Sequence, residues 1–275
     1  MKGKSAVFQP FPTQNVRDLD PFLLLHHQKT IIEPGSHPRL EGEDPHPHRG
    51  FSVVNFVIKG QLYHQDSRGN KSVVGPLGMQ WLDAAMGIIH SERPTKEFAY
   101  EGGNLELVQL WINLPERQKM SQPAYHECTA DRAKKVKSNS GQSIAYLYTG
   151  RLNNQKAEVN PYYPVTSAVI SLREEDTFEL QIDDKSTSFL YIIDGRISVP
   201  GFGMIDSHNA VPFQGDGHTI VIKGLKKSKV LLMSGKSIEE NYAVNGPFVM
   251  QNETKLLEAM RDYQMGKMGF LVEEF

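Results

Sequence analysis

Short apolar runs rich in β-branched and aromatic residues recur along the chain, and no other feature of the sequence constrains the fold as much. Each run has the length of a strand, and the 23 glycines and 16 prolines of the 275 residues are scattered between the runs. Closely spaced strands separated by turn residues predict an all-β barrel or sandwich. The runs are Phe51–Ile58, Ser72–Val74, Leu105–Ile112, Ile144–Tyr148, Val165–Leu172, Ser188–Ile193 and Val230–Met233.

The two halves of the chain share a weakly repeated strand–turn pattern. Val57–Gly60 and Ile192–Gly195 each join the end of an apolar run to a glycine, and a Gly/Pro-containing stretch follows each of them. Asp66–Asn70 and Asp194–Arg196 have the composition of hairpin turns. The pattern predicts a duplicated β-barrel, two domains of similar size.

Two segments interrupt the strand pattern. The polar stretch Thr129–Gln142 predicts a solvated linker between the two barrels. Further on, Asn252 is a candidate N-cap and Gly266 a candidate terminator, which predicts a helix between them. We expect its apolar stripe to pack on the same protein. The stripe consists of Leu256, Leu257, Met260 and Tyr263.

Charge and composition exclude several classes of function. Lys and Arg number 30 against 32 Asp and Glu, a net charge of −2, which argues against direct nucleic-acid binding and against an anionic membrane surface. We find neither a signal-peptide core nor an apolar stretch long enough to span a membrane, so we expect a cytoplasmic protein, or a nuclear one if the source is eukaryotic. Cys128 is the single cysteine, which excludes internal disulfides and thiolate zinc sites.

Histidine is concentrated in the first part of the chain, and two histidines stand two residues apart. On extended chain, His46 and His48 point to the same side, about 6.5–7 Å apart along the backbone, so both imidazoles can reach one metal ion. Pro45 and Pro47 favour this extended form. Because proline is excluded from a central ladder, we expect the segment to lead into a strand that begins near Arg49.

A second pair, His90 and Glu92, has the same spacing. On a neighbouring antiparallel strand the two pairs would combine three imidazole nitrogens with one carboxylate, a set that suits Fe(II), Mn, Ni, Cu or Zn. Four protein ligands leave two positions open on a six-coordinate ion, as catalysis or ligand binding requires. Either pair alone could be a chance spacing; both in one β-rich domain favour a metal site. His26 and His27 point to opposite sides of a strand and cannot both bind one ion.

These segments resemble the signature of the pirin family in the cupin superfamily. The resemblance covers about residues 20–125 and 246–265 and is loose between them. The matching motifs are Pro21–Leu23, His46–Phe51, Tyr63–Asn70, Gln80-Trp81, Gly87–Glu92, Gln109–Leu114 and Gly246–Met250.

The resemblance implies a bicupin, with two face-to-face β-barrels and a short C-terminal helix. It implies one mononuclear metal held by His46, His48, His90 and Glu92, with iron favoured and Mn, Ni, Cu and Zn as alternatives. His208 and His218 stand alone in the second half, so we expect structural roles for them. The expected division is a metal-binding barrel over 1–128, a linker over 129–142, a metal-free barrel over 143–240, and a tail with the helix, packed on the barrels, over 241–275.

The sequence departs from the family pattern at three places. Ser52 stands where many members have Glu, Gly78 is displaced in the turn before Gln80, and Arg93 stands where Met is commoner. Because Glu92 takes the ligand role in pirin-like chains, we expect the departure at Ser52 to change hydrogen bonds around the site without abolishing it.

Some pirin-like proteins have quercetin 2,3-dioxygenase activity, and the resemblance therefore implies a metal-dependent dioxygenase. The expected substrates are O₂ and a flavonol such as quercetin, or a related aromatic or enediol compound. Glu92 would accept the flavonol proton through its spare oxygen. A non-catalytic metal-binding regulatory protein with an unidentified protein partner remains an alternative, as does a cupin isomerase or epimerase without redox chemistry. We expect a monomer.

Overall fold

The chain folds almost entirely into β-strands, which confirms the all-β prediction. The computed structural model describes residues 5–14, 16, 19–183, 185–213 and 217–275. It divides into two compact units, the first made of residues 1–9, 22–129 and 238–275 and the second of residues 10–21 and 130–237. Among the described residues, no helix has the length and apolar character needed to cross a membrane.

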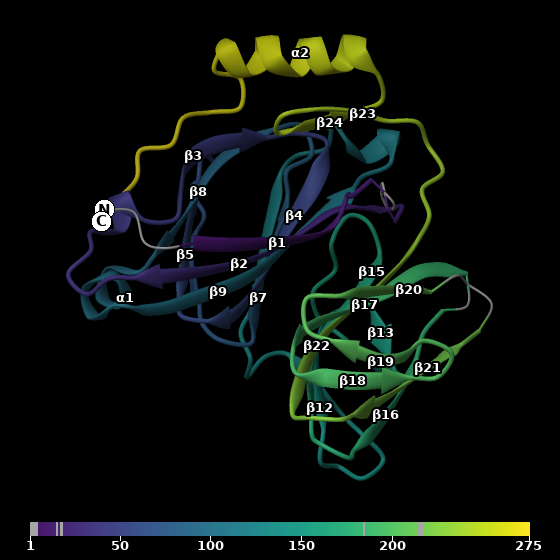
Figure 1. Cartoon of the computed structure of the whole chain (residues 1–275). Helices are drawn as coiled ribbons and strands as arrows, with labels where there is room; N and C mark the ends of the chain where they lie inside the picture. The colour runs from purple at the N-terminus through teal and green to yellow at the C-terminus, as the bar shows by residue number, and fades with distance from the viewer. Residues whose placement is uncertain (1–4, 15, 17–18, 184, 214–216) are drawn as a thin grey trace. The chain divides into compact units, whose positions relative to one another are not determined.

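The first unit contains two facing sheets (Figure 1). The larger sheet has the order β1-β2-β9-β4-β7-β10 and the smaller one the order β3-β8-β5-β6. The larger sheet comprises β1 (Ser5–Phe11), β2 (Phe22–Ile32), β9 (Gly103–Asn113), β4 (Phe51–Lys59), β7 (Gly78–Asp83) and β10 (Ala124–Cys128). The smaller sheet comprises β3 (Glu43–His48), β8 (Ile88–Pro94), β5 (Leu62–Asp66) and β6 (Lys71–Val74).

Four short helical elements and a small hairpin complete the first unit. Figure 1 shows α2 beside the hairpin β23–β24. The helix α1 was not predicted from the sequence; its N-cap Thr95 accepts a hydrogen bond from the Phe98 amide at 3.1 Å. These elements are η1 (Pro38–Leu40), α1 (Lys96–Glu101), η2 (Glu116–Gln118), β23 (Ala243–Asn245), β24 (Phe248–Met250) and α2 (Glu253–Gln264).

The predicted C-terminal helix is confirmed, but its expected apolar stripe is partly wrong. Asn252 caps α2 by accepting a hydrogen bond from the Lys255 amide at 3.0 Å. The buried face is formed by Leu256 and Ala259, which pack with Ile89 of β8. Met260 packs against this face, but Leu257 is 65% and Tyr263 39% exposed, because the hairpin β23–β24 and Ile89 cover one side of the helix.

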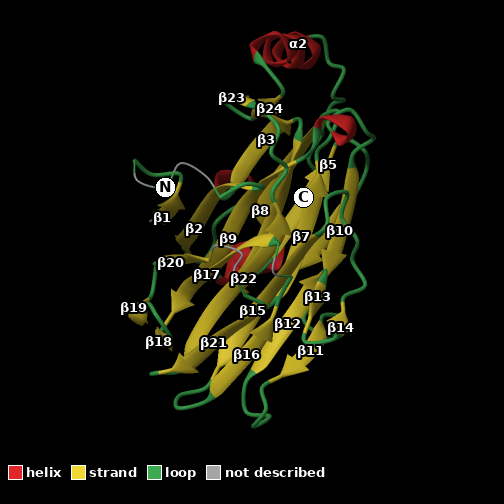
Figure 2. Ribbon diagram, turned by 90° about the vertical axis from the view of Figure 1, so that its right-hand side faces the viewer, coloured by secondary structure: helices red, strands yellow, loops and turns green. Residues whose placement is uncertain are grey.

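The second unit repeats the layout of a six-stranded and a four-stranded sheet (Figure 2). The larger sheet comprises β11 (Lys134–Lys137), β12 (Ile144–Thr149), β15 (Val165–Leu172), β22 (Ser228–Lys236), β17 (Ser186–Asp194) and β20 (Ala210–Phe213). The smaller sheet comprises β16 (Thr177–Gln181), β21 (Thr219–Gly224), β18 (Arg196–Val199) and β19 (Gly203–Asp206). A separate hairpin joins β13 (Arg151–Leu152) to β14 (Gln155–Lys156).

The stretch that we expected to be an irregular linker contains a strand. β11 pairs antiparallel with β12, and Val136 is buried while its lysine neighbours are exposed. This alternation is typical of a strand with one solvated face, and the lysines obscured it in the sequence because only one apolar residue marks the buried side.

The two units differ in the side chains buried between their sheets. One continuous apolar cluster fills the space between the sheets of the second unit, with Leu147, Ile170, Phe178, Leu190 and Ile222 among its members. The clusters found among the described residues of the first unit are smaller. Buried histidines, amides and carboxylates accompany the apolar residues of the first unit, whereas the described buried polar residues of the second unit are serines, Thr149 and Asp176.

Candidate metal centre

The two predicted histidine segments lie on neighbouring antiparallel strands. In the pairing of β3 with β8, His46 lies opposite His90. Our expectation that a strand begins only near Arg49 was wrong, because His46 and His48 themselves lie on β3. The strand tolerates Pro45 and Pro47 because it forms the edge of its sheet, where missing amide donors leave no ladder partner unpaired.

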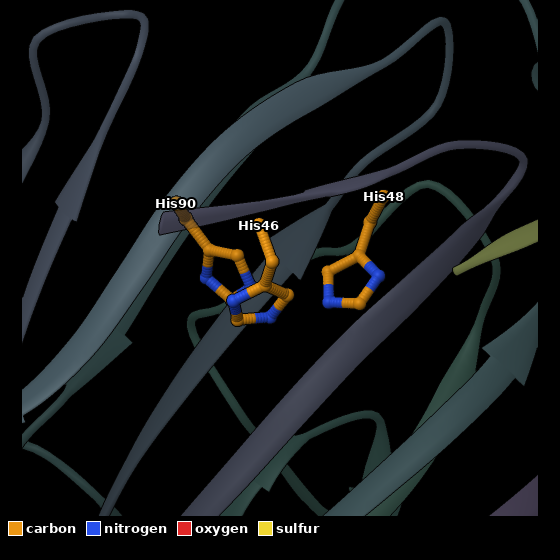
Figure 3. A group of neighbouring side chains, drawn as sticks. All are labelled: His46, His48 and His90. Carbon is orange, nitrogen blue, oxygen red and sulfur yellow. The ribbon is translucent and has the colours of Figure 1, made fainter. Parts of the chain in front are cut away.

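Three imidazoles gather in one place between the sheets (Figure 3). The ring centroids of His46 and His90 are 4.4 Å apart, those of His46 and His48 4.7 Å, and those of His48 and His90 4.9 Å. One nitrogen from each ring lies within 4.8 Å of the other two. Ligands with bonds of about 2.1 Å to one ion lie about 3–4 Å apart, so small ring movements would bring all three to a common metal.

The lowered pKa values of His48 and His90 suit metal binding. Burial, with the charge of His46 adding to it, holds the pKa of His48 well below the usual value, and burial together with His46, His48 and His64 does the same for the pKa of His90. Neutral imidazole is the form that binds a metal. His46 donates from Nδ1 to the Asp44 carbonyl at 2.7 Å, and in the neutral ring this hydrogen bond selects the tautomer whose Nε2 can bind a metal.

His90 carries the clearest sign that a group is required here. Its side chain is 1% exposed, yet neither Nδ1 nor Nε2 has a hydrogen-bond partner among the described residues. Buried polar atoms are nearly always paired, because an unpaired one costs about 1–3 kcal/mol. A metal ion at the centre of the three histidines would satisfy this ring, so the residues present fit the metal that the donor set implies.

Glu92 lies beside the histidine triad and is 3% exposed. A carboxylate oxygen of Glu92 lies within 4.8 Å of nitrogens of His64 and His90. These three residues form a second candidate group, which shares His90 with the group of His46, His48 and His90. Burial raises the pKa of Glu92 to about 8, the charge of Glu43 adds to this, and hydrogen bonds from Gln80 and Asn55 oppose it. A cation beside the carboxylate would lower that pKa again, which is a second sign that the site fits a metal.

Three side-chain amides reach Glu92 from the opposite sheet. Asn55 of β4 lies in register with Gln80 of β7 and with Gln109 of β9, so the three form a row across the sheet. Asn55 Nδ2 donates to Glu92 Oε1 at 2.5 Å and Gln80 Nε2 donates to the same oxygen, while Gln109 Nε2 lies 3.4 Å from Oε2. Oε1 is therefore fixed, and Oε2 keeps capacity for another partner.

His64 is a further candidate that the sequence analysis did not identify. His64 lies on β5, opposite Glu92 of β8. Its Nε2 contacts Asp66 Oδ2 at 3.1 Å, and its ring stacks on that of Tyr125 with the centroids 4.2 Å apart. Its Nδ1 is buried without a hydrogen-bond partner among the described residues. His64 and Asp66 share the i, i+2 spacing of the other two pairs, and that spacing was the signal that could have found it.

The turn after His48 is held by two buried cations. Arg49 donates to the Met86 carbonyl at 2.6 Å and to Asp262 of α2 at 3.0 Å. Lys119 donates to the Gly50 carbonyl at 2.7 Å, to Asn113 Oδ1 at 2.6 Å and to the Val249 carbonyl at 3.2 Å. Burial lowers the pKa of Lys119 to about 7, although Glu240 and Glu116 act to raise it.

The three departures from the family pattern have different consequences. Ser52 donates to Asp83 Oδ1 at 2.5 Å. Gly78 begins β7, so the displaced turn leaves Gln80 on that strand. Arg93 is buried and bonded to several partners around β3.

His27 lies outside the candidate metal centre, with Nε2 2.9 Å from Glu106 Oε1.

Comparison with known sequences gives two family matches. The family described as Pirin matches residues 4–112, and the Pirin C-terminal cupin domain matches residues 167–269. A pirin-like protein of Solanum lycopersicum is 32% identical over 93% of this chain and 84% of its own length. A Pseudomonas aeruginosa protein, to which its name provisionally assigns quercetin 2,3-dioxygenase activity, is 28% identical over 90% of this chain and 86% of its own length.

Solved structures share the fold. A quercetin 2,3-dioxygenase from Acinetobacter baumannii superposes with a TM-score of 0.88 at 24% identity and covers 99% of this chain and 100% of that one. The bacterial pirin YhhW from Escherichia coli, in complex with nickel(II), has a TM-score of 0.66 at 20% identity and covers 85% of this chain and 92% of that one. These neighbours confirm the bicupin fold.

Proposed function

The chain belongs to the pirin family, and from that premise we propose that it is a metal-dependent dioxygenase that cleaves a flavonol such as quercetin, or a related phenol or enediol, with O₂. The named activities of the Pseudomonas and Acinetobacter proteins support this reaction class. The proposal assigns the metal to His46, His48, His90 and Glu92. Iron(II) is the first candidate; nickel, found with YhhW, is among the alternatives.

The observation that carries the proposal is the buried ring of His90, whose nitrogens have no hydrogen-bond partner in the described part of the chain and which lies between two other imidazoles and a carboxylate. A structural histidine would have its nitrogens paired with protein groups. In a site with open positions, a metal of this kind supplies Lewis acidity and a place for O₂ chemistry.

The protein groups around the site suit an aromatic hydroxyl substrate. The ring of Trp111 lies 5.6 Å from that of His48 and 4.5 Å from that of Phe51, and it is only partly buried. It offers an aromatic surface on which a flavonol ring can stack. His46 is the partly exposed member of the triad, so solvent reaches the centre from its side.

Glu92 is the group that we assign to proton transfer. Asn55 and Gln80 donate to Oε1, whereas the hydrogen bond given for Oε2 among the described residues is the long one from Gln109. That oxygen can accept the proton of the flavonol hydroxyl, and the amide row keeps the carboxylate oriented while it does so.

The test is oxygen uptake and carbon monoxide release with quercetin, using protein reconstituted with Fe(II), Mn, Ni or Cu. We expect turnover by the wild type and a loss of about 10²–10⁴-fold in kcat for Glu92→Gln, the usual range for removal of a general base. Glu97→Gln on the exposed side of α1 is the matched control and should leave kcat unchanged.

Three results would contradict parts of the proposal. Metal-loaded protein that consumes no O₂ with any flavonol or enediol would favour the regulatory alternative. Conversion of substrate without O₂ uptake would favour an isomerase or epimerase. Unchanged kcat in Glu92→Gln would remove Glu92 from proton transfer.

A further inference from the structure

Arg93 uses all of its hydrogen-bonding capacity inside the first unit. Its side chain is 3% exposed, and a guanidinium has five N–H donors. Nε and Nη2 donate to the two oxygens of Glu273 at 2.9 and 3.2 Å, and Nη2 also donates to Asp44 Oδ1 at 2.6 Å. Nη1 donates to the carbonyls of Arg39 and Glu41 at 3.1 and 2.9 Å. Every donor therefore has an acceptor.

These acceptors belong to the stretch 39–44, which enters and begins β3, and to the segment 267–275. That segment is anchored on the smaller sheet: Ser67 donates to the Met268 carbonyl at 2.7 Å, and the Glu274 amide donates to Gln65 at 2.8 Å. Figure 1 shows the chain running from α2 to the C-terminus. Arg93 thus ties β8 to two segments distant in the sequence.

The ladder hydrogen bonds of β3 are interrupted just before the first histidine. The register with β8 shifts between Glu43 and His46. Pro45 and Pro47 have no amide hydrogen to donate. At this point the position of the strand depends on side-chain contacts, and Arg93 to Asp44 is the shortest of those from Arg93.

Asp44 connects this contact to the candidate metal centre. Its carboxylate accepts from Arg93, and its carbonyl accepts from Nδ1 of His46 at 2.7 Å. The carboxylate of Asp44 is 79% exposed, so an ion pair there would contribute little by itself. The side chain of Glu273 is 8% exposed and accepts hydrogen bonds from Nε and Nη2 of Arg93. This bidentate pair fixes the orientation of the guanidinium.

We propose that Arg93 is a positioning residue for His46, and that Glu273 of the segment 267–275 orients Arg93 for that role. The inference rests on the proposed function in one respect, namely that His46 is a metal ligand. The relay Glu273–Arg93–Asp44–His46 presets the Nδ1–H form of His46 and directs Nε2 toward the other two histidines. It adds a determinant of metal affinity outside the ligand set.

The first measurement is the metal dissociation constant, obtained by competition with a chromophoric chelator. We expect Arg93→Met to weaken binding about 10–100-fold, the usual effect of removing a group that orients a ligand. Arg93→Lys keeps the positive charge but not the bidentate geometry of the guanidinium, so it should weaken metal binding less than Arg93→Met does. Glu273→Gln should also weaken metal binding less than Arg93→Met. Arg196→Met is the matched control, because Arg196 forms a bidentate pair with Asp206 on an exposed hairpin of the second unit.

Two further measurements separate positioning from general stability. In a His46→Ala background, Arg93→Met should cause no additional loss of affinity, as a double-mutant cycle requires for residues acting through one contact. In metal-free protein, nitrogen-15 NMR of the histidines should show the Nδ1–H form for His46 in the wild type and a mixture of tautomers in Arg93→Met.

An unchanged dissociation constant together with an unchanged His46 tautomer would overturn the proposal, even if the melting temperature fell. Wild-type protein that binds no metal would overturn the proposed function instead, and the tautomer measurement would still decide the role of Arg93. If Arg93→Met does not fold, the same two readouts on Glu273→Gln decide it.

Discussion

The turn between β3 and β4 requires a glycine at position 50. Its φ is +89°, and a Cβ at this position would lie 1.8 Å from the Val249 carbonyl oxygen. The Gly50 amide also donates to the Ala85 carbonyl at 2.8 Å. The turn separates His48 from the aromatic residue Phe51, so its conformation sets where both side chains lie.

Gly50→Ala should therefore cost much more stability than Gly69→Ala. Gly69 has nearly the same φ, +88°, but nothing lies within 4 Å of its Cβ position. We expect about 1–2 kcal/mol for Gly69→Ala from the backbone conformation alone, and more than about 4 kcal/mol for Gly50→Ala from the added collision. Urea unfolding measures the free energy of unfolding of both variants. An equal decrease in the two would contradict the expected collision at Gly50, because the turn would then accommodate a Cβ.

The candidate ligand pairs could be singled out from the sequence because each pair lies within one short segment. The i, i+2 spacing of His46 with His48, and of His90 with Glu92, is sufficient to place each pair on one face of a strand. Asn55 and Gln80 could not be found in this way, because sheet order and register bring them to Glu92 and neither is encoded in local spacing.

Among the elements, β9 is a central strand of the larger sheet of the first unit. It pairs with β2 on one side and with β4 on the other. Glu106 of β9 accepts from Lys59 of β4 at 2.8 Å and lies 2.9 Å from His27 of β2. Burial acts to raise the pKa of Glu106, but the hydrogen bonds from His27 and Lys59 and the charges of Lys29 and Lys59 outweigh it and bring the pKa to about 2.

This lowered pKa predicts an acid-sensitive contribution to stability. Because the pKa of Glu106 is lower in the folded protein than its ordinary value of 4.5, the contribution is fully present above about pH 4.5 and is lost as the pH falls toward about 2. Urea unfolding should show Glu106→Gln to be less stable than wild type at pH 7, with a difference that shrinks across this range. Exposed Glu101→Gln is the control; a pH-independent difference for Glu106→Gln would contradict the assignment.

The central strands were predictable because they combine strand length, β-branched residues and flanking turns. Val165–Leu172 matches the bounds of β15, and Phe51–Ile58 lies within β4. β3 was missed because its two prolines argue against a strand unless its place at the sheet edge is known. The exposure of Leu257 on α2 was missed because the number of apolar residues does not reveal how wide a face the neighbouring sheet can cover.

For the molecule as a whole, the same sheet layout occurs in both units with different buried side chains. Each has a six-stranded and a four-stranded sheet. The second is filled by a continuous apolar cluster, which stabilises it through burial. The first has buried histidines, amides and a carboxylate between its sheets, and such polar groups cost stability unless they are paired with one another or with a bound group. The duplicated layout was predictable from the repeated strand–turn pattern, whereas the strand β11 within 129–142 was not.

The central claim is that the first unit holds one transition metal, and metal content by mass spectrometry tests it most directly. We would use protein prepared without a histidine tag and reconstituted with Fe(II), with His48→Ala as the test variant and exposed His218→Ala as the control. The account predicts about one equivalent of metal in the wild type and in His218→Ala, and a large loss in His48→Ala. Wild-type protein that retains no metal after reconstitution with Fe(II), Mn, Ni and Cu would contradict it.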